Sequence, residues 1–283
     1  MPELPEVETV RTGLVPLAVG REISHIEVFH PRTARYNPEG LAAIHGQRIT
    51  ALARRGKYLW FETPGELALV AHLGMSGQFR VGGELRHRRA SLFFTDGVQL
   101  DFSDQRTFGY LRLAKLVPTA DGLSAAMGTT RAAVPENVAH IGRDLIDPAF
   151  DLAAVTEKVL RKNTEIKRVL LDQTVAAGIG NIYADEALFA AQIHPQRNTR
   201  TLTADDIARI YQAAHEVLRA ALQAGGTSFD ALYVNVNGES GYFERSLQVY
   251  GREGQPCVRC GHPVSRITFM NRSSHICASC QLI

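Results

Sequence analysis

The spacing of apolar residues changes near position 150 of the chain. Before this point, short apolar runs separated by glycine and proline are typical of β-strands. The clearest runs lie at residues 57–62, 67–72 and 111–115. Asp96-Gly97 joins two further runs, and this dipeptide is a hairpin turn signal. From Asp151 onward the apolar residues recur with a helical period, so the pattern predicts a β-rich first part and a helical second part.

Two helices have especially clear patterns. One precedes the strands, with Pro5 in its first turn. Its apolar face contains Val7, Val10 and Leu14. The other is expected over residues 205–223 and is ended by Gly225-Gly226. Its apolar face contains Ile207, Ile210, Ala214, Val217 and Ala221.

Proline and glycine are scattered through residues 117–150, which indicates a loop followed by an interdomain linker. The first domain would be a helix packed on a β-sandwich or barrel, and the next domain would be helical. We therefore expect an α+β chain of four segments. These are an N-terminal β-sandwich domain at 2–130, a linker at 131–150, a helical domain at 151–236 and a C-terminal segment at 237–283.

Composition sets modest limits on function. Of 283 residues, 45% are hydrophobic and 21% are charged, so the chain can form about two ordinary domains and one small module. No segment reaches the roughly 18 apolar residues that a membrane helix needs. The acidic N-terminus also lacks the apolar core of a secretory signal. We expect a cytoplasmic protein with no membrane partner.

A glycine turn in the helical part offers an anion site. Gly178 and Gly180 precede Asn181, which is expected to begin a helix and to present free backbone N–H groups. A lone Gly-x-Gly is weak evidence for a nucleotide site, and no β-α-β context surrounds it. We therefore expect no nucleotide cofactor.

All four cysteines of the chain lie close to its end, in a C-x2-C-x16-C-x2-C pattern. They are Cys257, Cys260, Cys277 and Cys280. Two such pairs on either side of a short hairpin can bring four thiolates to one tetrahedral metal ion, so the spacing predicts one structural Zn²⁺. The alternatives are two disulfides in a secreted protein and four unrelated core cysteines.

The segment with the cysteines is also the basic end of the chain. The whole chain has a net charge of +2, yet residues 241–283 hold five arginines and two glutamates, a local net charge of +3. A small basic zinc hairpin often binds nucleic-acid phosphate. The alternative is an ordinary solvated surface.

Four motifs occur together and in order along the chain. They are Met-Pro-Glu-Leu-Pro-Glu-Val-Glu at 1–8, Asn-Ile-Tyr-Ala-Asp-Glu at 181–186, Gly-Tyr-Phe at 241–243 and the four cysteines. With them the chain resembles the bacterial formamidopyrimidine-DNA glycosylases, which remove 8-oxoguanine and cut the strand, along its whole length. The resemblance implies a catalytic β-sandwich, a helix-two-turns-helix domain and a zinc hairpin. Damaged double-stranded DNA would bind in the cleft between the domains, and monomer is the default state.

The resemblance also assigns the chemistry. Removal of Met1 would leave Pro2 as an N-terminal amine, whose pKa of about 8 keeps far more of it unprotonated than a lysine. Pro2 would attack C1′ of the damaged nucleotide to form a Schiff base, and β,δ-elimination would follow. Glu3 would handle protons, with Glu6 helping to position the group. Glu8 is expected only to complement the helix dipole. Two basic residues complete the catalytic set, namely Lys57 and the phosphate-binding Arg272.

Six further residues match the family's DNA contacts. Three would fill the gap left by an everted base: Met75, Arg106 and Phe108. His72 and Asn181 would bind phosphate, and Lys167 would lie near the damaged base. Residues 227–241 match the loop that caps the lesion.

The chain departs from the family pattern at two places. Gln105 and Thr107 stand where proline and arginine are usual, so the gap-filling loop lacks its stiffening proline. Arg89 stands where a histidine is usual, and its phosphate role is left open.

Two rival functions remain. One is the sister enzyme, which removes oxidised pyrimidines with the same proline chemistry. The Pro-Glu-Leu-Pro-Glu start favours the purine enzyme. The other is a zinc-ribbon DNA-binding protein without catalysis, which the intact Pro2, Glu3, Lys57 and Arg272 disfavour.

Overall fold

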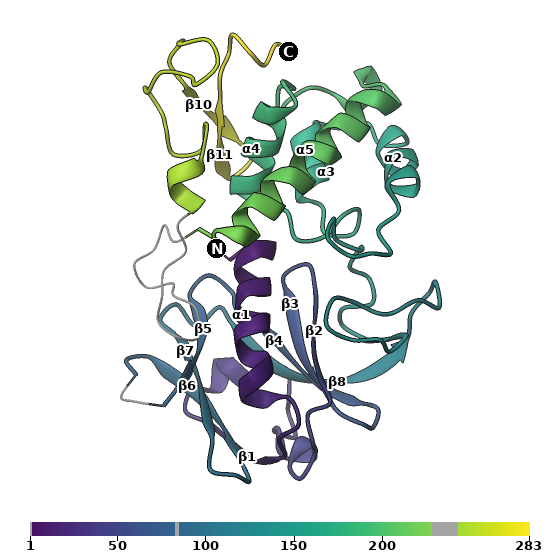
Figure 1. The fold of residues 1–283 in the computed structure, drawn as a ribbon, viewed down its shortest axis with the longest axis vertical. Helices are drawn as coiled ribbons and strands as arrows, with labels where there is room; N and C mark the ends of the chain where they lie inside the picture. The colour runs from purple at the N-terminus through teal and green to yellow at the C-terminus, as the bar shows by residue number, and fades with distance from the viewer. Residues whose placement is uncertain (1, 83–84, 228–242) are drawn as a thin grey trace. The chain divides into compact units, whose positions relative to one another are not determined.

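The computed structural model describes residues 2–82, 85–227 and 243–283 (Figure 1). These residues form two compact units. The first contains residues 2–82, 85–140 and 224–227, and the second contains residues 141–223 and 243–283. Within the described ranges, no helix has the length and apolar character needed to cross a membrane.

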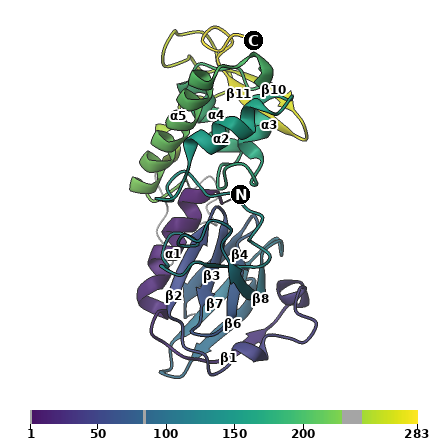
Figure 2. The ribbon, with the colours of Figure 1, turned by 90° about the vertical axis from the view of Figure 1, so that its right-hand side faces the viewer.

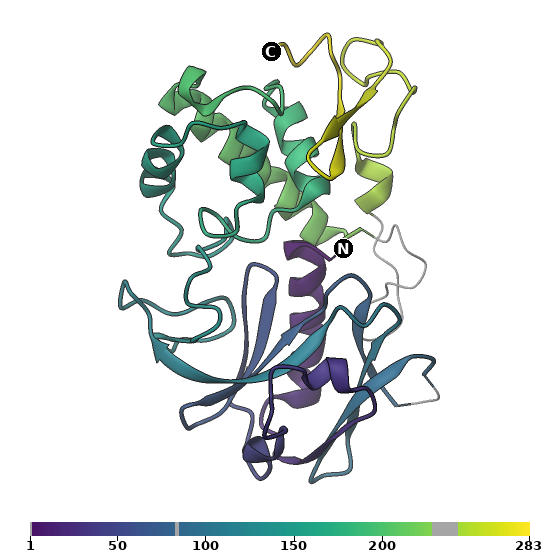
Figure 3. The ribbon, with the colours of Figure 1, turned by 180° about the vertical axis from the view of Figure 1, so that it is seen from behind.

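The first unit is a leading helix on a two-sheet sandwich. The helix α1 spans Leu4–Ala18. One sheet has the order β1-β6-β7-β5, with β1 at Ile23–Val28, β5 at Gly77–Val81, β6 at Arg88–Phe94 and β7 at Gln99–Asp104. The other has the order β2-β3-β4-β8-β9, with β2 at Ala51–Arg55, β3 at Tyr58–Glu62, β4 at Leu67–His72, β8 at Tyr110–Pro118 and β9 at Ala133–Pro135. All these pairings are antiparallel. Between β1 and β2, the 3-10 turns η1 (Pro31–Ala34) and η2 (Ala42–Ile44) are seen most clearly from behind (Figure 3).

The core lies between the two sheets. Phe61 of β3 and Phe79 of β5 bring rings from opposite sheets to a centroid distance of 5.7 Å, and both rings are buried. The predicted apolar face of α1 joins the same core. The predicted hairpin is also confirmed: β6 and β7 flank the Asp96-Gly97 turn, where Gly97 has a φ of +88°.

Residues 133–135 form the edge strand β9, although a loop and linker were predicted there. Val134 pairs with Val117, so β8 continues beyond the predicted run at 111–115. Pro118 and Pro135 lie at this edge of the sheet, where proline is tolerated. The isolated strand-like bridge from Met127 to Arg54 is a further contact that the proline-rich composition concealed.

The second unit packs four helices and a two-stranded hairpin (Figure 2). The helices are α2 (Leu152–Leu160), α3 (Ile166–Leu171), α4 (Asn181–Ala190) and α5 (Ala204–Gln223). The 3-10 turns are η3 (Thr199–Thr201) and η4 (Phe243–Ser246), and the hairpin strands are β10 (Ser265–Phe269) and β11 (Arg272–Ile276). The predicted start of α4 at Asn181 and end of α5 at Gln223 are confirmed. On α5, Leu218 is buried whereas the predicted Val217 is only half-buried.

Candidate functional site

The N-terminal motif caps α1. Pro2 and Glu3 are buried, and Glu3 is the N-cap residue of the helix. The Glu3 and Glu6 side chains each accept a hydrogen bond from the other residue's backbone N–H, with 2.8 Å from the Glu3 nitrogen to Glu6 Oε2. The other oxygen of Glu6, Oε1, accepts from the backbone nitrogen and Oγ1 of Thr227 at 2.8 and 3.0 Å. Glu6 thus ties α1 to the last described residue before 228–242, and most of the predicted capping loop lies outside the described residues.

Lys57 lies in the turn between β2 and β3, one residue before the strand in which it was expected. Arg55 pairs with Tyr58 across this turn, which leaves Gly56 and Lys57 as its two central residues. Gly56 has a φ of +56°, as the first central position of a type II′ hairpin requires. Lys57 is 9% exposed.

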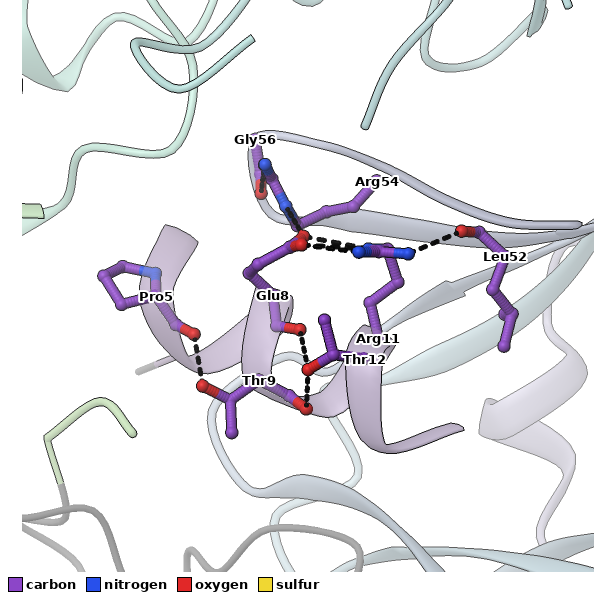
Figure 4. Close-up of polar contacts among 8 residues, drawn as sticks. All are labelled: Pro5, Glu8, Thr9, Arg11, Thr12, Leu52, Arg54 and Gly56. Carbon is purple, nitrogen blue, oxygen red and sulfur yellow. Dashed lines mark hydrogen bonds and ion pairs between the residues drawn. The ribbon is translucent and has the colours of Figure 1, made fainter. Parts of the chain in front are cut away.

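Glu8 forms a buried ionic network that the sequence did not predict (Figure 4). Its carboxylate accepts from Arg54 Nε of β2 at 2.7 Å and from Arg11 Nη2 of α1 at 2.7 Å. Arg54 is fully buried and also donates to the Gly56 carbonyl at 3.0 Å. Glu8 therefore does more than complement the helix dipole, because its carboxylate also pairs with two arginines.

His72 ends β4 and lies between two tyrosine rings. It stacks on Tyr110 at 5.4 Å between centroids and is tilted against Tyr58 at 5.0 Å. Burial, with the charges of Lys57 and Arg35, lowers the pKa of His72 to about 4. Its Nδ1 accepts from the Gly74 backbone N–H, so the neutral ring carries its proton on Nε2. Such a ring can donate a hydrogen bond to phosphate without being charged.

The three predicted gap-filling residues lie on two adjoining loops of the first unit. Met75 and Phe108 are 39% and 48% exposed, so neither is a core residue. Arg106 Nη1 lies 3.6 Å from Met75 Sδ. Met75 and Phe108 are therefore available, beside Arg106, to an external partner.

Asp104 holds these loops together. Its carboxylate accepts from the backbone N–H groups of Arg106 and Gly109 at 3.2 and 2.7 Å, and from Ser76 Oγ at 2.5 Å. Arg89 Nε donates to the Asp104 carbonyl at 2.8 Å. The Arg89 side chain therefore supports the loop through the Asp104 backbone.

The two departures in the gap-filling loop are accommodated. Thr107 adopts a φ of +54°, in the left-handed region that non-glycine residues rarely occupy. Arg35 donates to the carbonyls of Phe108 and Gly109, both at 2.9 Å. These bonds constrain a loop in which Gln105 replaces the stiffening proline.

In the second unit, the four cysteines form one cluster. Their Sγ atoms all lie within 4.8 Å of one another, and the cysteines are free thiols rather than disulfides. Four thiolates at about 2.3 Å from one ion would lie about 4 Å apart, so the cluster fits tetrahedral zinc. No other group of three or more metal-ligating side chains is found in the described part of the chain.

Arg272 begins β11, opposite Phe269 and directly after the Met270-Asn271 turn. Its side chain is exposed. It thus stands at the tip of the zinc hairpin, where a cation is available to an external anion.

Lys167 and Asn181 both bind the zinc hairpin at the residues that follow Arg272 on β11. Lys167 is fully buried: its ammonium pairs with Asp185 at 2.6 Å and donates to Ser274 Oγ at 2.7 Å. Asn181 Nδ2 donates to the Ser273 carbonyl at 3.0 Å. The resemblance implies that Lys167 lies near the damaged base; in this structure its ammonium lies in the interior of the second unit, paired with Asp185.

Two acidic residues of α4 were missed by the sequence analysis. Asp185 accepts from the His275 backbone N–H at 2.9 Å as well as pairing with Lys167. Glu186 accepts from three successive backbone N–H groups at 2.8 to 2.9 Å, those of Gln248, Val249 and Tyr250. Burial raises the pKa of Glu186 despite these bonds. Two adjacent acids on a helix that is otherwise apolar and buried were the available signal.

Three family models match the chain. Residues 1–111 match the formamidopyrimidine-DNA glycosylase N-terminal domain, residues 141–232 match the H2TH domain of the same enzymes, and residues 254–283 match the zinc finger found in FPG and IleRS.

Curated relatives and solved structures agree with these models. The formamidopyrimidine-DNA glycosylases of Acidothermus cellulolyticus and Rhodococcus jostii are 52% and 53% identical, over 99% of this chain and 97% and 96% of theirs. The MutM (Fpg) protein of Thermus thermophilus is 36% identical with a TM-score of 0.83, covering 99% of this chain and 98% of that one. A Lactococcus lactis Fpg mutant, in complex with a Fapy-dG containing DNA, is 33% identical with a TM-score of 0.83, covering 100% of both chains.

Proposed function

Because the chain belongs to the formamidopyrimidine-DNA glycosylase family, we propose that it excises 8-oxoguanine and formamidopyrimidines from duplex DNA through a Schiff base on Pro2. It is a base-excision repair glycosylase with AP lyase activity, and its zinc finger holds one structural Zn²⁺. The proposal concerns its substrates, its nucleophile and the route of strand cleavage.

The reaction begins with the amine of Pro2 once Met1 has been removed. Its lone pair forms a bond to C1′, and the electrons of the glycosidic bond leave with the damaged base. The Pro2 nitrogen then loses its proton and the C1′–O4′ bond breaks as Glu3, which is 2% exposed, protonates O4′, and this ring opening leaves the iminium. Loss of a proton from C2′ of the iminium expels the 3′ phosphate, and loss of the proton from C4′ then expels the 5′ phosphate. Lys57 assists departure of the base.

Recognition requires that the damaged nucleotide leave the base stack. Met75 and Phe108 enter the duplex, and Arg106 pairs with the orphaned base. His72, Asn181 and Arg272 bind phosphate. Lys167 contributes to recognition of the damaged base through the hairpin that it holds, because its own side chain is buried.

Zinc supplies structure rather than reactivity. Bound to the four thiolates, it folds the hairpin that presents Arg272. We also propose that the protein acts as a monomer in the cytoplasm, associated with the nucleoid when bound to DNA.

One observation carries this proposal: Met75, Arg106 and Phe108 are displayed from two adjoining loops that Asp104 fixes. That arrangement supports a protein that opens a base step and fills the gap. A binder that only grips phosphate has no need of exposed Met75 and Phe108.

The test is borohydride trapping on a duplex that carries 8-oxoguanine opposite cytosine, followed by mass spectrometry of the cross-linked peptide. A cross-link at Pro2, with Met1 absent, supports nucleophile, mechanism and substrate class together. Trapping only on oxidised pyrimidines would identify the sister activity. Tight binding with no trapping on either substrate would identify a DNA-binding protein without catalysis.

A further inference from the structure

Glu8 and Arg54 connect the helix that begins at Pro2 to the turn that carries Lys57. We propose that these two are positioning residues, which fix the nucleophile and Lys57 in one geometry; the inference rests on the proposed function of Pro2. Neither was assigned such a role from the sequence.

The connection is a continuous line of hydrogen bonds within the first unit (Figure 4). Arg54 Nε donates to Glu8 Oε2 at 2.7 Å, and Nη1 of the same guanidinium donates to the Gly56 carbonyl at 3.0 Å. That carbonyl belongs to the peptide bond whose nitrogen is that of Lys57. The planar guanidinium therefore transmits the position of Glu8 to the first backbone atom of Lys57.

On the side of α1, only a short and rigid stretch of helix separates Glu8 from Pro2 and Glu3. Glu8 lies in the second turn of α1, six residues after Pro2 and five after Glu3. Because the first turn is held by its capping box, a shift of Glu8 relative to β2 moves the helix start with it.

Arg11 provides the second arm of the network and differs in one respect. It donates to Glu8 from Nε and Nη2, but its Nη1 reaches the Leu52 carbonyl of β2 at 3.2 Å. Arg11 therefore holds α1 on the sheet at Leu52, whereas Arg54 reaches the turn that carries Lys57. It offers a control with the same charge and the same partner, although its side chain is 11% exposed and that of Arg54 is not exposed.

The network is buried and ionised. Arg54 has no exposed side-chain surface, and the side chains of Glu8 and Arg11 are only 10% and 11% exposed. Burial alone would raise the pKa of Glu8, but hydrogen bonds and charges from Arg11 and Arg54 outweigh it and hold its pKa below the usual value. A buried pair of this kind fixes geometry because a displaced partner would leave an uncompensated charge.

The test separates geometry from charge. Arg54→Lys keeps the cation and one bond to Glu8, but a single ammonium cannot span both Glu8 and the Gly56 carbonyl. We expect single-turnover trapping on the 8-oxoguanine duplex to slow at least about tenfold, since a displacement near 1 Å can cost up to ~100-fold. Binding to a duplex with a non-cleavable abasic analogue should change less than about twofold, because no phosphate contact is removed. Glu8→Gln should slow trapping in the same way, and the matched Arg11→Lys should trap near the wild-type rate.

Each alternative outcome decides the matter. Folded Arg54→Lys and Glu8→Gln proteins that trap at the wild-type rate would overturn the proposal. An equal loss in Arg11→Lys would also overturn it, since the network would then contribute only stability. So would a loss of trapping matched by a loss of affinity. Wild-type protein that traps no DNA would overturn the proposed function, and this inference with it, whereas failure confined to the variants leaves that function standing.

Discussion

A Cβ atom on Gly74 would lie 2.5 Å from the backbone nitrogen of Gly109, closer than real atoms approach. The loop that carries Met75 and the loop that carries Phe108 therefore pack backbone against backbone. Glycine at position 74 permits this approach, and the Asp104 carboxylate bonds both loops from the buried side. The side chains proposed to fill the gap are therefore carried by two loops whose backbones have little freedom to move.

Gly74→Ala should consequently loosen the support and destabilise the first unit. Alanine would meet the Gly109 backbone and would also adopt a φ of +61°, at a combined cost of about 3 kcal/mol. We expect weaker discrimination between cytosine and adenine opposite 8-oxoguanine, measured by strand cleavage alongside urea unfolding.

The control for this prediction is Gly46→Ala. Gly46 has a φ of +75° but nothing within 4 Å of its Cβ position, so only the backbone cost of about 1 kcal/mol applies. Equal losses of stability and discrimination in both variants would show that the close approach of Gly74 and Gly109 is immaterial.

His72 should give the folded protein a distinct dependence on acid. Its folded pKa of about 4 lies below the unfolded value near 6.5, so its neutral ring contributes stability that is fully present above pH 6.5. That contribution is lost as the pH falls toward 4, and it amounts to about 3 kcal/mol. In His72→Gln, which cannot titrate, this part of the pH dependence of the unfolding free energy should disappear. Identical profiles for the two proteins between pH 7 and pH 4 would contradict the assignment.

Local signals in the sequence located several elements well. Three of these elements depend only on neighbours a few residues away. They are the α1 face at Val7, Val10 and Leu14, the Asp96-Gly97 turn, and the glycines that end α5. The four cysteines were equally informative, because two C-x2-C pairs on either side of a short hairpin are typical of one metal site. Their Sγ atoms do form one cluster.

Long-range pairing was not predictable in the same way. Glu8 and Arg54 are 46 positions apart, and each looks like an ordinary surface charge until the sheet brings them together. Lys167 is similar: only the packing of β11 on α4 shows that its ammonium is buried against Asp185. Met75 and Phe108 are exposed, although methionine and phenylalanine are usually buried. Their residue types alone would therefore have predicted core positions, and only the family resemblance indicated a role at the surface.

Lys167→Met should destabilise the second unit strongly. It removes the Lys167 cation from a fully buried ion pair with Asp185, and breaking such a pair typically costs about 3–5 kcal/mol. The matched control is Lys162→Met, because Lys162 pairs with Asp172 at 3.1 Å while both side chains are about a third exposed. We expect that change to cost at most about 1 kcal/mol. The measurement is the free energy of unfolding of both variants in urea. Similar losses of stability in the two variants would show that burial of the Lys167–Asp185 pair does not determine the cost.

Removal of zinc should abolish the action of Arg272 while leaving the first unit folded. The metal holds Cys257, Cys260, Cys277 and Cys280, and the hairpin between the two cysteine pairs carries Arg272 at its tip. A chelator should therefore weaken binding to damaged duplex by at least about tenfold, and added zinc should restore it. Trp60, the one tryptophan of the chain, is fully buried in β3, so its fluorescence reports on the first unit separately and should not change. Arg272→Ala should weaken binding comparably yet retain one zinc per chain by metal analysis. Zinc-free protein that binds as tightly as the zinc-loaded form would show that the hairpin contributes nothing to DNA binding.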